Sequence, residues 1–155
     1  MSRSTAMVNK YFAGVLPPAG TLNDLDLAFI DQFAPVIERV DQLMNEQAFN
    51  KALQSIWELI SAANKYIDDS SPWALAKDPA QQERLGTVLY NLLEAVRIVA
   101  LLVGPFLPET AERILQALGQ AEADLSLGDN SRWGLLQPGT TIDKTKPLFP
   151  RIEVE

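Results

Sequence analysis

The stretch FNKALQSIWELISAANKYI (Phe49–Ile67) decides the fold class, because its apolar residues recur at steps of three and four. On a helix of 3.6 residues per turn these steps form one apolar stripe, made of Phe49, Ala52, Leu53, Ile56, Trp57, Ile60, Ala63 and Ile67. A helix with such a stripe is stable when the stripe is buried against other elements. The stretch therefore predicts a long amphipathic helix in a multi-helix domain, with Trp57 in the core.

The segments around this stretch also predict helices. Their approximate limits are Ser4–Ala13, Asn23–Gln47, Pro79–Gly104 and Glu109–Leu118. Pro35 should kink or split the second segment, because proline lacks the N–H that a helix interior needs. Asp78 is a suitable N-cap for the segment that begins at Pro79. Later in that segment Arg97 is the only polar residue in a long apolar run, which predicts the most deeply buried part of the protein.

After Gly119, a residue type that favours a helix end, the helical pattern fades. Residues 120–155 are rich in proline and glycine, yet they carry Trp133, Leu135, Leu136, Leu148, Phe149 and Ile152. Apolar residues in such a segment indicate packing on this bundle or on a neighbouring domain, and we expect Trp133 to pack. The sequence predicts an all-α bundle of about five helices in residues 1–119, with an extended tail in residues 120–155.

The residue composition excludes many kinds of enzyme site. The 155 residues, 47% hydrophobic and 21% charged, include no cysteine and no histidine. Disulfides, thiolate zinc sites and Ser-His or Cys-His dyads are therefore excluded. The sequence also has neither a glycine-rich phosphate loop nor an Asp-x-Asp-x-Asp-Gly calcium loop.

The charge and the apolar runs bear on partners and location. The net charge of −7 argues against generic binding to phosphate backbones, which needs clustered lysine and arginine. Residues 1–20 are an exception, since they carry Arg3 and Lys10 and no acidic residue. No apolar run reaches the roughly 18–20 residues that span a bilayer, and the N-terminal residues lack the apolar core of a signal peptide. We therefore expect the cytosol as the location.

The stretch DDSSPW (Asp68–Trp73) places the largest apolar side chain directly after a polar helix end. Pro72 fixes the backbone before Trp73, and Ser70 or Ser71 can cap the short turn. The residues alone leave two interpretations open. Trp73 either plugs the end of the bundle or stands on a stiff turn as an exposed aromatic platform, the kind of surface on which unpaired RNA bases stack.

The sequence contains, in this order, the blocks NKYFAGVLP, IWELISAANKYIDDSSPWALAKD, VLYNLLEAVRIVALLVGPFLPETAERI and WGLLQPGTTIDKTKPLFPRIE. Over essentially all 155 residues the chain resembles the anticodon-binding helical domain of bacterial methionyl-tRNA synthetases. The related class I synthetases for isoleucine, valine, leucine and cysteine share this domain type and are the alternative. The block PLFPRIE favours methionine among them.

The resemblance implies a cytosolic parent enzyme, methionine tRNA with its CAU anticodon as partner, and contact with the parent's catalytic domain. It implies neither DNA nor a membrane. In this family the catalytic domain uses ATP and magnesium, with motifs of the His-Ile-Gly-His and Lys-Met-Ser-Lys-Ser types, and its zinc-binding insertion needs cysteines. The stretch DKTKP (Asp143–Pro147) does not match the lysine motif and follows the bundle. We therefore expect a fragment without methionine activation and without a metal or cofactor of its own.

The resemblance assigns contact with the anticodon bases to Trp73. A second family element, Asn-x-x-x-Arg, places an amide and a guanidinium on one helical face, where they can bind base edges. Arg3 matches this arginine, but the asparagine would fall before Met1, so Arg3 either meets RNA without its partner or lies on a frayed end. Weaker candidates are Asn9, Lys10, Asn64 and Lys77, of which the lysines either meet a phosphate or stay solvated.

Two other interpretations compete with RNA recognition. The apolar tail favours a protein-interaction or structural module, because PLFPRI would pack on a catalytic domain and would favour self-association once exposed. Paired carboxylates could also suggest acid–base catalysis. However, Asp68 with Asp69 fits a polar helix end, and Glu109 with Glu112 fits the acidic first turn of a helix.

Overall fold

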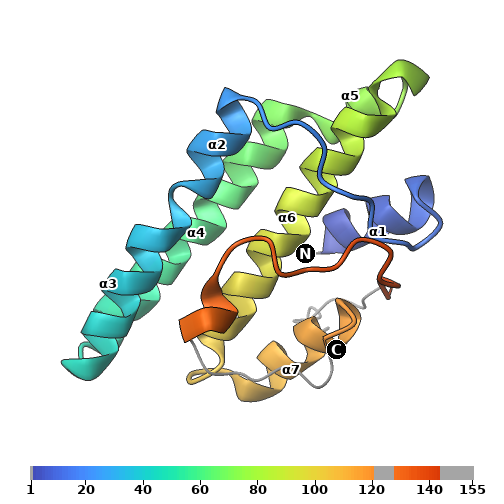
Figure 1. Ribbon diagram of the computed structural model, residues 1–155. Coiled ribbons are helices and arrows are strands. Elements are labelled where there is room, and N and C mark those ends of the chain that lie inside the picture. The colour runs from blue at the N-terminus through green and yellow to red at the C-terminus, as the bar shows by residue number, and fades with distance from the viewer. Residues whose placement is uncertain (1, 121–127, 144–155) are drawn as a thin grey trace, which may run out of the picture.

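Two long antiparallel helices, α4 (Phe49–Ser70) and α6 (Gln82–Val103), form the centre of the protein (Figure 1). The computed structural model describes residues 2–120 and 128–143. The other elements are the helices α1 (Ser2–Tyr11), α2 (Asp24–Ile30), α3 (Phe33–Asn45), α5 (Pro72–Leu75) and α7 (Pro108–Ala117), with 3-10 turns at Pro79–Gln81 and Gly128–Ser131. The predicted all-α bundle is confirmed. Within the described residues, the β-type pairing is one isolated bridge, between Val15 and Thr141.

Helix α6 is the core helix, because α1, α2, α4, α5 and α7 all pack against it. Together with its leading 3-10 turn, it is long and apolar enough to cross a membrane by length and composition, with a mean hydropathy of 1.7. However, 83% of that apolar window is buried by the surrounding helices. Arg97 itself is buried, but Val96, Val99 and Val103 are only half-buried, whereas every residue from 85 to 95 is buried. The prediction that residues 96–103 are the most deeply buried part is therefore wrong, because the neighbouring helices cover the preceding turns of α6 more completely. On the other side of α4, α3 packs antiparallel to it (Figure 1).

The predicted second helix is split into α2 and α3. The break falls at Asp31 and Gln32, so that Pro35 lies in the first turn of α3, where its missing N–H removes no helical hydrogen bond. A capping box begins α2: Asp26 N–H donates to Asn23 Oδ1 at 3.0 Å, and Asn23 N–H donates to Asp26 Oδ2 at 2.9 Å. This cap places the Asp26 side chain at the start of α2, where it is buried.

The prediction that Trp57 lies in the core is wrong, because 67% of its surface is exposed. The stripe of α4 is broader than the surface that its neighbours cover. Ala52, Ile56 and Leu59 face α3 and α6 and are buried, whereas Leu53 and Trp57 lie along the edge of the stripe and are exposed. Periodicity identified the apolar side of α4 correctly, but it could not say how far around the helix the neighbours reach.

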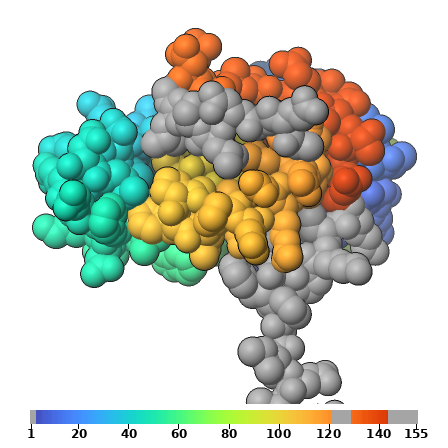
Figure 2. Space-filling view, turned by 90° about the horizontal axis from the view of Figure 1, so that it is seen from below, coloured from blue at the N-terminus to red at the C-terminus, as the bar shows by residue number. Residues whose placement is uncertain are grey.

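Part of the predicted tail, residues 128–143, packs on the bundle. Leu136 is buried, and Tyr90 O–H on α6 donates to its carbonyl at 2.8 Å. Trp133 packs edge-on against Phe33 of α3, with the ring centroids 4.9 Å apart, so its predicted packing is confirmed. Figure 2, seen from below, shows this segment in red and red-orange beside the orange α7.

The remaining tail predictions lie beyond this segment. Leu148, Phe149, Ile152 and most of DKTKP lie outside the described residues. The division of the chain at residue 119 into bundle and tail stays a prediction. Ile142 is nevertheless buried in the same hydrophobic core as the helices, so residues 128–143 share that core.

Candidate nucleic-acid interface

Trp73 lies on α5, a single helical turn that follows α4 after one residue. That residue, Ser71, has φ +48°, in the left-handed region, and its N–H donates to the Ile67 carbonyl at 3.0 Å. Pro72 is the first residue of α5 and is buried, whereas 44% of Trp73 is exposed. The indole is therefore carried by a short, fixed turn, and much of its surface remains open to solvent.

The hydroxyl groups of the two serines bond to the end of α4. Ser70 Oγ–H donates to the Tyr66 carbonyl at 2.5 Å, and Ser71 Oγ–H donates to the Asp68 carbonyl at 3.0 Å. The predicted side-chain cap of the short turn is therefore wrong, because α5 begins without one. The Ser70 hydroxyl bonds instead to the carbonyl one turn earlier on its own helix. The Asp68 carbonyl is open to Ser71 because Pro72, four residues on, has no N–H.

The return from α5 to α6 is capped as the sequence predicted. Asp78 Oδ1 accepts from Ala80 N–H at 3.0 Å, and Pro79 begins the 3-10 turn that leads into α6. Lys77 lies in this connection with an exposed side chain. Its ammonium makes no hydrogen bond or ion pair with another described residue, so it is available to an anion.

A buried polar network lies beside this turn, centred on the Asp26 carboxylate. Tyr66 O–H on α4 donates to Asp26 Oδ1 at 2.5 Å. Arg84 on α6 donates from Nη1 to Oδ2 at 2.5 Å and from Nη2 to Oδ1 at 2.8 Å, a bidentate pair. Asn91 Nδ2, also on α6, donates to the Tyr66 hydroxyl oxygen at 3.1 Å. One carboxylate thus joins α2, α4 and α6.

The network keeps fixed charges at neutral pH. Burial acts to raise the pKa of Asp26, but the hydrogen bonds from Arg84, Tyr66 and Asn23 outweigh it and hold that pKa below its ordinary value of 3.8. Hydrogen bonding to Asp26 raises the pKa of Arg84. Burial, together with the neighbouring carboxylate, raises the pKa of Tyr66. The trio is therefore a carboxylate, a neutral phenol and a guanidinium.

The sequence reasoning missed this network. The pattern Asn23-x-x-Asp26 is a readable capping signal, since both side chains suit the start of a helix. Nothing in the sequence, however, indicates that Tyr66 and Arg84 meet that carboxylate, because their hydrogen bonds to Asp26 span 40 and 58 residues.

The three candidates on α1 are not equivalent. Arg3 is exposed, and its guanidinium makes no hydrogen bond or ion pair with another described residue. Lys10 is also exposed, with Nζ 5.2 Å from the ring centroid of the tyrosine that follows it. Asn9, in contrast, donates from Nδ2 to the carbonyls of Thr5 and Ile142 at 2.9 and 3.1 Å. Its amide therefore ties α1 to the returning tail.

The candidate RNA-binding residues come from different helices, and these helices all pack on α6. Asn64 is exposed on α4, one turn and a half before Ser70. Helices α1 and α5 both pack on α6; in Figure 1, α5 lies at the upper end of α6 and α1 lies to its right. The structure thus brings the helices of Arg3 and Trp73 onto the same core helix.

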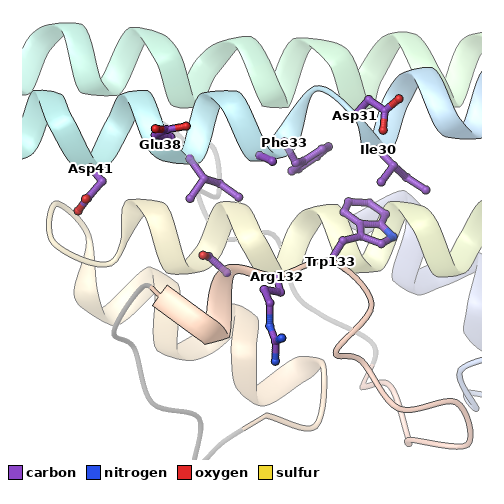
Figure 3. A pocket seen from close by; sticks show the side chains of 10 residues that line it. Ile30, Asp31, Phe33, Glu38, Asp41, Arg132 and Trp133 are labelled. Carbon is purple, nitrogen blue, oxygen red and sulfur yellow. The ribbon is translucent and has the colours of Figure 1, made fainter.

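A groove of about 550 Å³ lies between α3 and the segment that contains Trp133 (Figure 3). Its walls include Phe33 and Trp133, and its α2–α3 rim carries the exposed carboxylates of Asp31, Glu38 and Asp41. Such a rim repels phosphates, so this groove is a poor site for RNA. Within residues 2–120 and 128–143, no group of three or more acidic side chains is arranged to hold a metal ion.

Comparison with known proteins identifies the family of this fold. A family model described as the anticodon binding domain of methionyl tRNA ligase matches residues 16–155. The chain belongs to this family. The domain is 43% identical to the methionine–tRNA ligase of Caldanaerobacter subterraneus and 39% identical to that of Bacillus subtilis. Both alignments include all of the domain but only 24% of the relative's length.

Solved structures agree with this assignment. The domain is similar to the free-state methionyl-tRNA synthetase of Mycobacterium tuberculosis, with a TM-score of 0.90 and 38% identity over 99% of the domain and 31% of that chain. A second structure of that enzyme, bound to methionyl-adenylate, has a TM-score of 0.82 and 37% identity over 96% of the domain and 29% of that chain. The predicted family is confirmed. Family membership assigns no role to single side chains, so the roles of Trp73, Arg3 and the weaker candidates stay predictions.

Proposed function

We propose that this domain recognises the CAU anticodon loop of methionine tRNA within a cytoplasmic methionine–tRNA ligase. The observation that carries the proposal is the exposed Trp73 indole on the fixed α4–α5 turn. Unpaired bases in an RNA loop are recognised by stacking on aromatic faces and by hydrogen bonds to their edges. Trp73 supplies such a face, and Arg3, Asn64 and Lys77 supply donors that have no partner among the described residues.

The rigidity of the turn favours stacking. Ser71 is held in the left-handed region and Pro72 is buried, so the indole loses little conformational freedom when a base binds. One base stacked on an aromatic side chain contributes about 1–3 kcal/mol. This contribution is large enough to account for much of the affinity for the loop, whereas the choice among bases would come from hydrogen bonds to their edges.

The charge distribution supports recognition through bases more than through phosphates. Asp68 and Asp69 are exposed at the end of α4, close in sequence to Trp73, and the net charge of the chain is −7. Lys77 and Lys10 are the cations proposed to meet phosphates, whereas Arg3 is proposed to meet a base edge. Because carboxylates near the platform repel other RNA, a loop that stacks well on Trp73 is favoured over a generic backbone.

Binding of a CAU stem-loop, compared with a loop whose first anticodon base is changed, tests the proposal. Trp73→Ala should weaken CAU binding about five- to one-hundred-fold, the equivalent of one lost stacked base. Trp57→Ala is the matched control, because Trp57 is the more exposed tryptophan and lies on α4, outside the α5 turn. If Trp73→Ala keeps the CAU preference, or Trp57→Ala loses it equally, the assignment of Trp73 is wrong.

The ligase reaction belongs to the parent enzyme in this proposal. Joining methionine to tRNA with ATP and magnesium would take place on the catalytic domain, which this domain would contact. The domain alone should show no methionine-dependent exchange between ATP and pyrophosphate above background. Measurable exchange would contradict this part of the proposal.

A second candidate, a protein-interaction or structural module, is favoured by a row of exposed apolar side chains on α4. Phe49, Leu53 and Trp57 follow one another at successive helical turns and are all exposed. This candidate predicts self-association of the domain through α4, measured by light scattering against concentration. A monomer at all concentrations would remove the support for it.

A further inference from the structure

The segment that carries Trp73 is held at both ends by one buried carboxylate. Tyr66 precedes this segment on α4, and Arg84 follows it on α6. Both side chains bond to Asp26, the tyrosine through its hydroxyl at 2.5 Å and the arginine through two N–H groups at 2.5 and 2.8 Å. The side chain of Asp26 is fully buried. The end of α4 and the start of α6 are therefore held at a fixed distance from each other, on either side of α5.

On the α4 side, the path from the carboxylate to Trp73 is short and continuous. The Tyr66 carbonyl accepts the Ser70 hydroxyl at 2.5 Å, one turn before α4 ends. Ser71 then turns the chain into α5, where Pro72 packs inside and Trp73 stands outside. A rotation of the last turn of α4 would therefore move the indole directly.

On the α6 side, Arg84 lies in the first turns of the helix, directly after the 3-10 turn that Asp78 caps. Its planar guanidinium meets both carboxylate oxygens, which fixes direction as well as distance. Lys77 lies between this cap and Trp73. The Asp26–Arg84 pair therefore also fixes the connection from α5 to α6, which carries Lys77, a proposed phosphate contact.

Two hydrogen bonds fix the orientation of the Tyr66 hydroxyl group. Its hydrogen is donated to Asp26, so its oxygen can only accept from Asn91 Nδ2, at 3.1 Å. Asn91 is itself fully buried on α6. The phenol is therefore held from two helices at once, and α4 cannot rotate without breaking one of these bonds.

We propose that Asp26, Tyr66 and Arg84 act as positioning residues, which set the orientation of Trp73 and through it the preference for the CAU loop. This inference rests on the proposed function only for its RNA readout. None of the three touches the bases in this account. They act through the end of α4 and the start of α6, so the effect of changing them should appear at Trp73 even without RNA.

The test compares two buried tyrosines that each lose one hydroxyl group. Tyr66→Phe breaks the bonds to Asp26 and Asn91, whereas Tyr90→Phe breaks the bond to the Leu136 carbonyl, at 2.8 Å and equally buried. The full domain is labelled with 5-fluorotryptophan, which gives one fluorine resonance for each of its three tryptophans. Single Trp→Phe variants assign the resonances.

Tyr66→Phe should shift or broaden the Trp73 resonance and weaken CAU binding about two- to tenfold, with a smaller loss for the changed loop. Tyr90→Phe should leave the Trp73 resonance and the loop preference unchanged. Arg84→Lys, which keeps the charge but loses the two-pronged contact, should act like Tyr66→Phe and decides the question if Tyr66→Phe does not fold.

Two results would overturn the inference: an unchanged Trp73 resonance in both Tyr66→Phe and Arg84→Lys, or an equal change of that resonance in Tyr90→Phe. The proposed function fails separately, if the unaltered domain does not prefer CAU. In that case the fluorine spectra still decide whether Asp26, Tyr66 and Arg84 position the indole.

Discussion

Glu94 and Arg97 lie one turn apart on α6, both buried, and together they hold the backbone of the returning tail. Arg97 donates from Nη1 to the Asn130 carbonyl at 2.6 Å and from Nη2 to the Arg132 carbonyl at 2.7 Å. The Glu94 carboxylate accepts the N–H groups of residues 134–136 at 2.8 to 3.2 Å. The buried Glu94–Arg97 ion pair on α6 therefore orders residues 130–136 through hydrogen bonds to their backbone.

Replacing Glu94 by Gln should destabilise the domain strongly. The substitution leaves the buried Arg97 without its counter-charge, and losing one partner of a buried pair typically costs about 3–5 kcal/mol. Urea denaturation measures the free energy of unfolding. Glu112→Gln is the control, an exposed glutamate on α7 whose replacement should change that free energy by less than about 0.5 kcal/mol. Equal stability of the two variants would contradict the role of the pair.

Gly119 and Gly134 should respond differently to alanine. Both have positive φ, +72° and +91°, so alanine costs about 1–2 kcal/mol in backbone strain at either position. At Gly119 the added Cβ would also collide with Thr140 Cγ2, whereas at Gly134 it would meet nothing within 4 Å. Gly119→Ala should therefore lower the melting temperature more than Gly134→Ala. The reverse order would show that the contact with Thr140 is not close in solution.

The stability of the domain should fall in acid partly through Asp26. Its pKa in the folded state is lower than its ordinary value of 3.8, so the unfolded state binds the proton first as the pH falls. The stabilisation from this group is complete above that ordinary pKa and is lost as the pH falls through the folded pKa. Free energies of unfolding across the acid range, compared between the unaltered domain and Asp26→Asn, should converge at the lowest pH. Parallel curves would contradict the assignment.

RNA binding should depend only weakly on salt. Each phosphate contact to a single strand contributes about −0.7 to the slope of log affinity against log salt concentration. If Lys10 and Lys77 are the cations that meet phosphates, the slope should be no steeper than about −1.5. Titrations of the CAU stem-loop at several salt concentrations measure it. A much steeper slope without preference for CAU would indicate generic binding.

Local signals predicted the helices well because local interactions form them. The stripe of α4, the cap formed by Asp78 and the stop at Gly119 all depend on neighbours in sequence, and the structure confirms each of them. The position of Trp57 depends on how much of α4 its neighbours cover, which is a property of packing between helices. That is why the same periodicity that located α4 misplaced its tryptophan.

The interior polar groups could not be predicted for a related reason. Asp26 was readable only as a helix cap and Arg97 only as an interruption of an apolar run, and the sequence analysis did not single out Glu94. Their partners are backbone groups and side chains far away in the sequence, and no residue pattern links them. Trp73 was identified because it directly follows a polar helix end and because the family resemblance assigns contact with the anticodon bases to it. The structure adds the fixed turn beneath it, although the base that it would face stays a prediction.

The pairing of residues 14–16 with residues 139–142 has a mechanical consequence. Leu16 N–H donates to the Thr140 carbonyl at 2.8 Å, and Ile142 N–H donates to the Gly14 carbonyl at 2.7 Å, in antiparallel order. The chain therefore enters and leaves this seam at the same end. Tension between its two flanks would peel the hydrogen bonds one after another, beginning at Ile142, instead of shearing them together. Because Leu16 and Ile142 are both buried in the hydrophobic core, separating these segments would also expose core side chains to water.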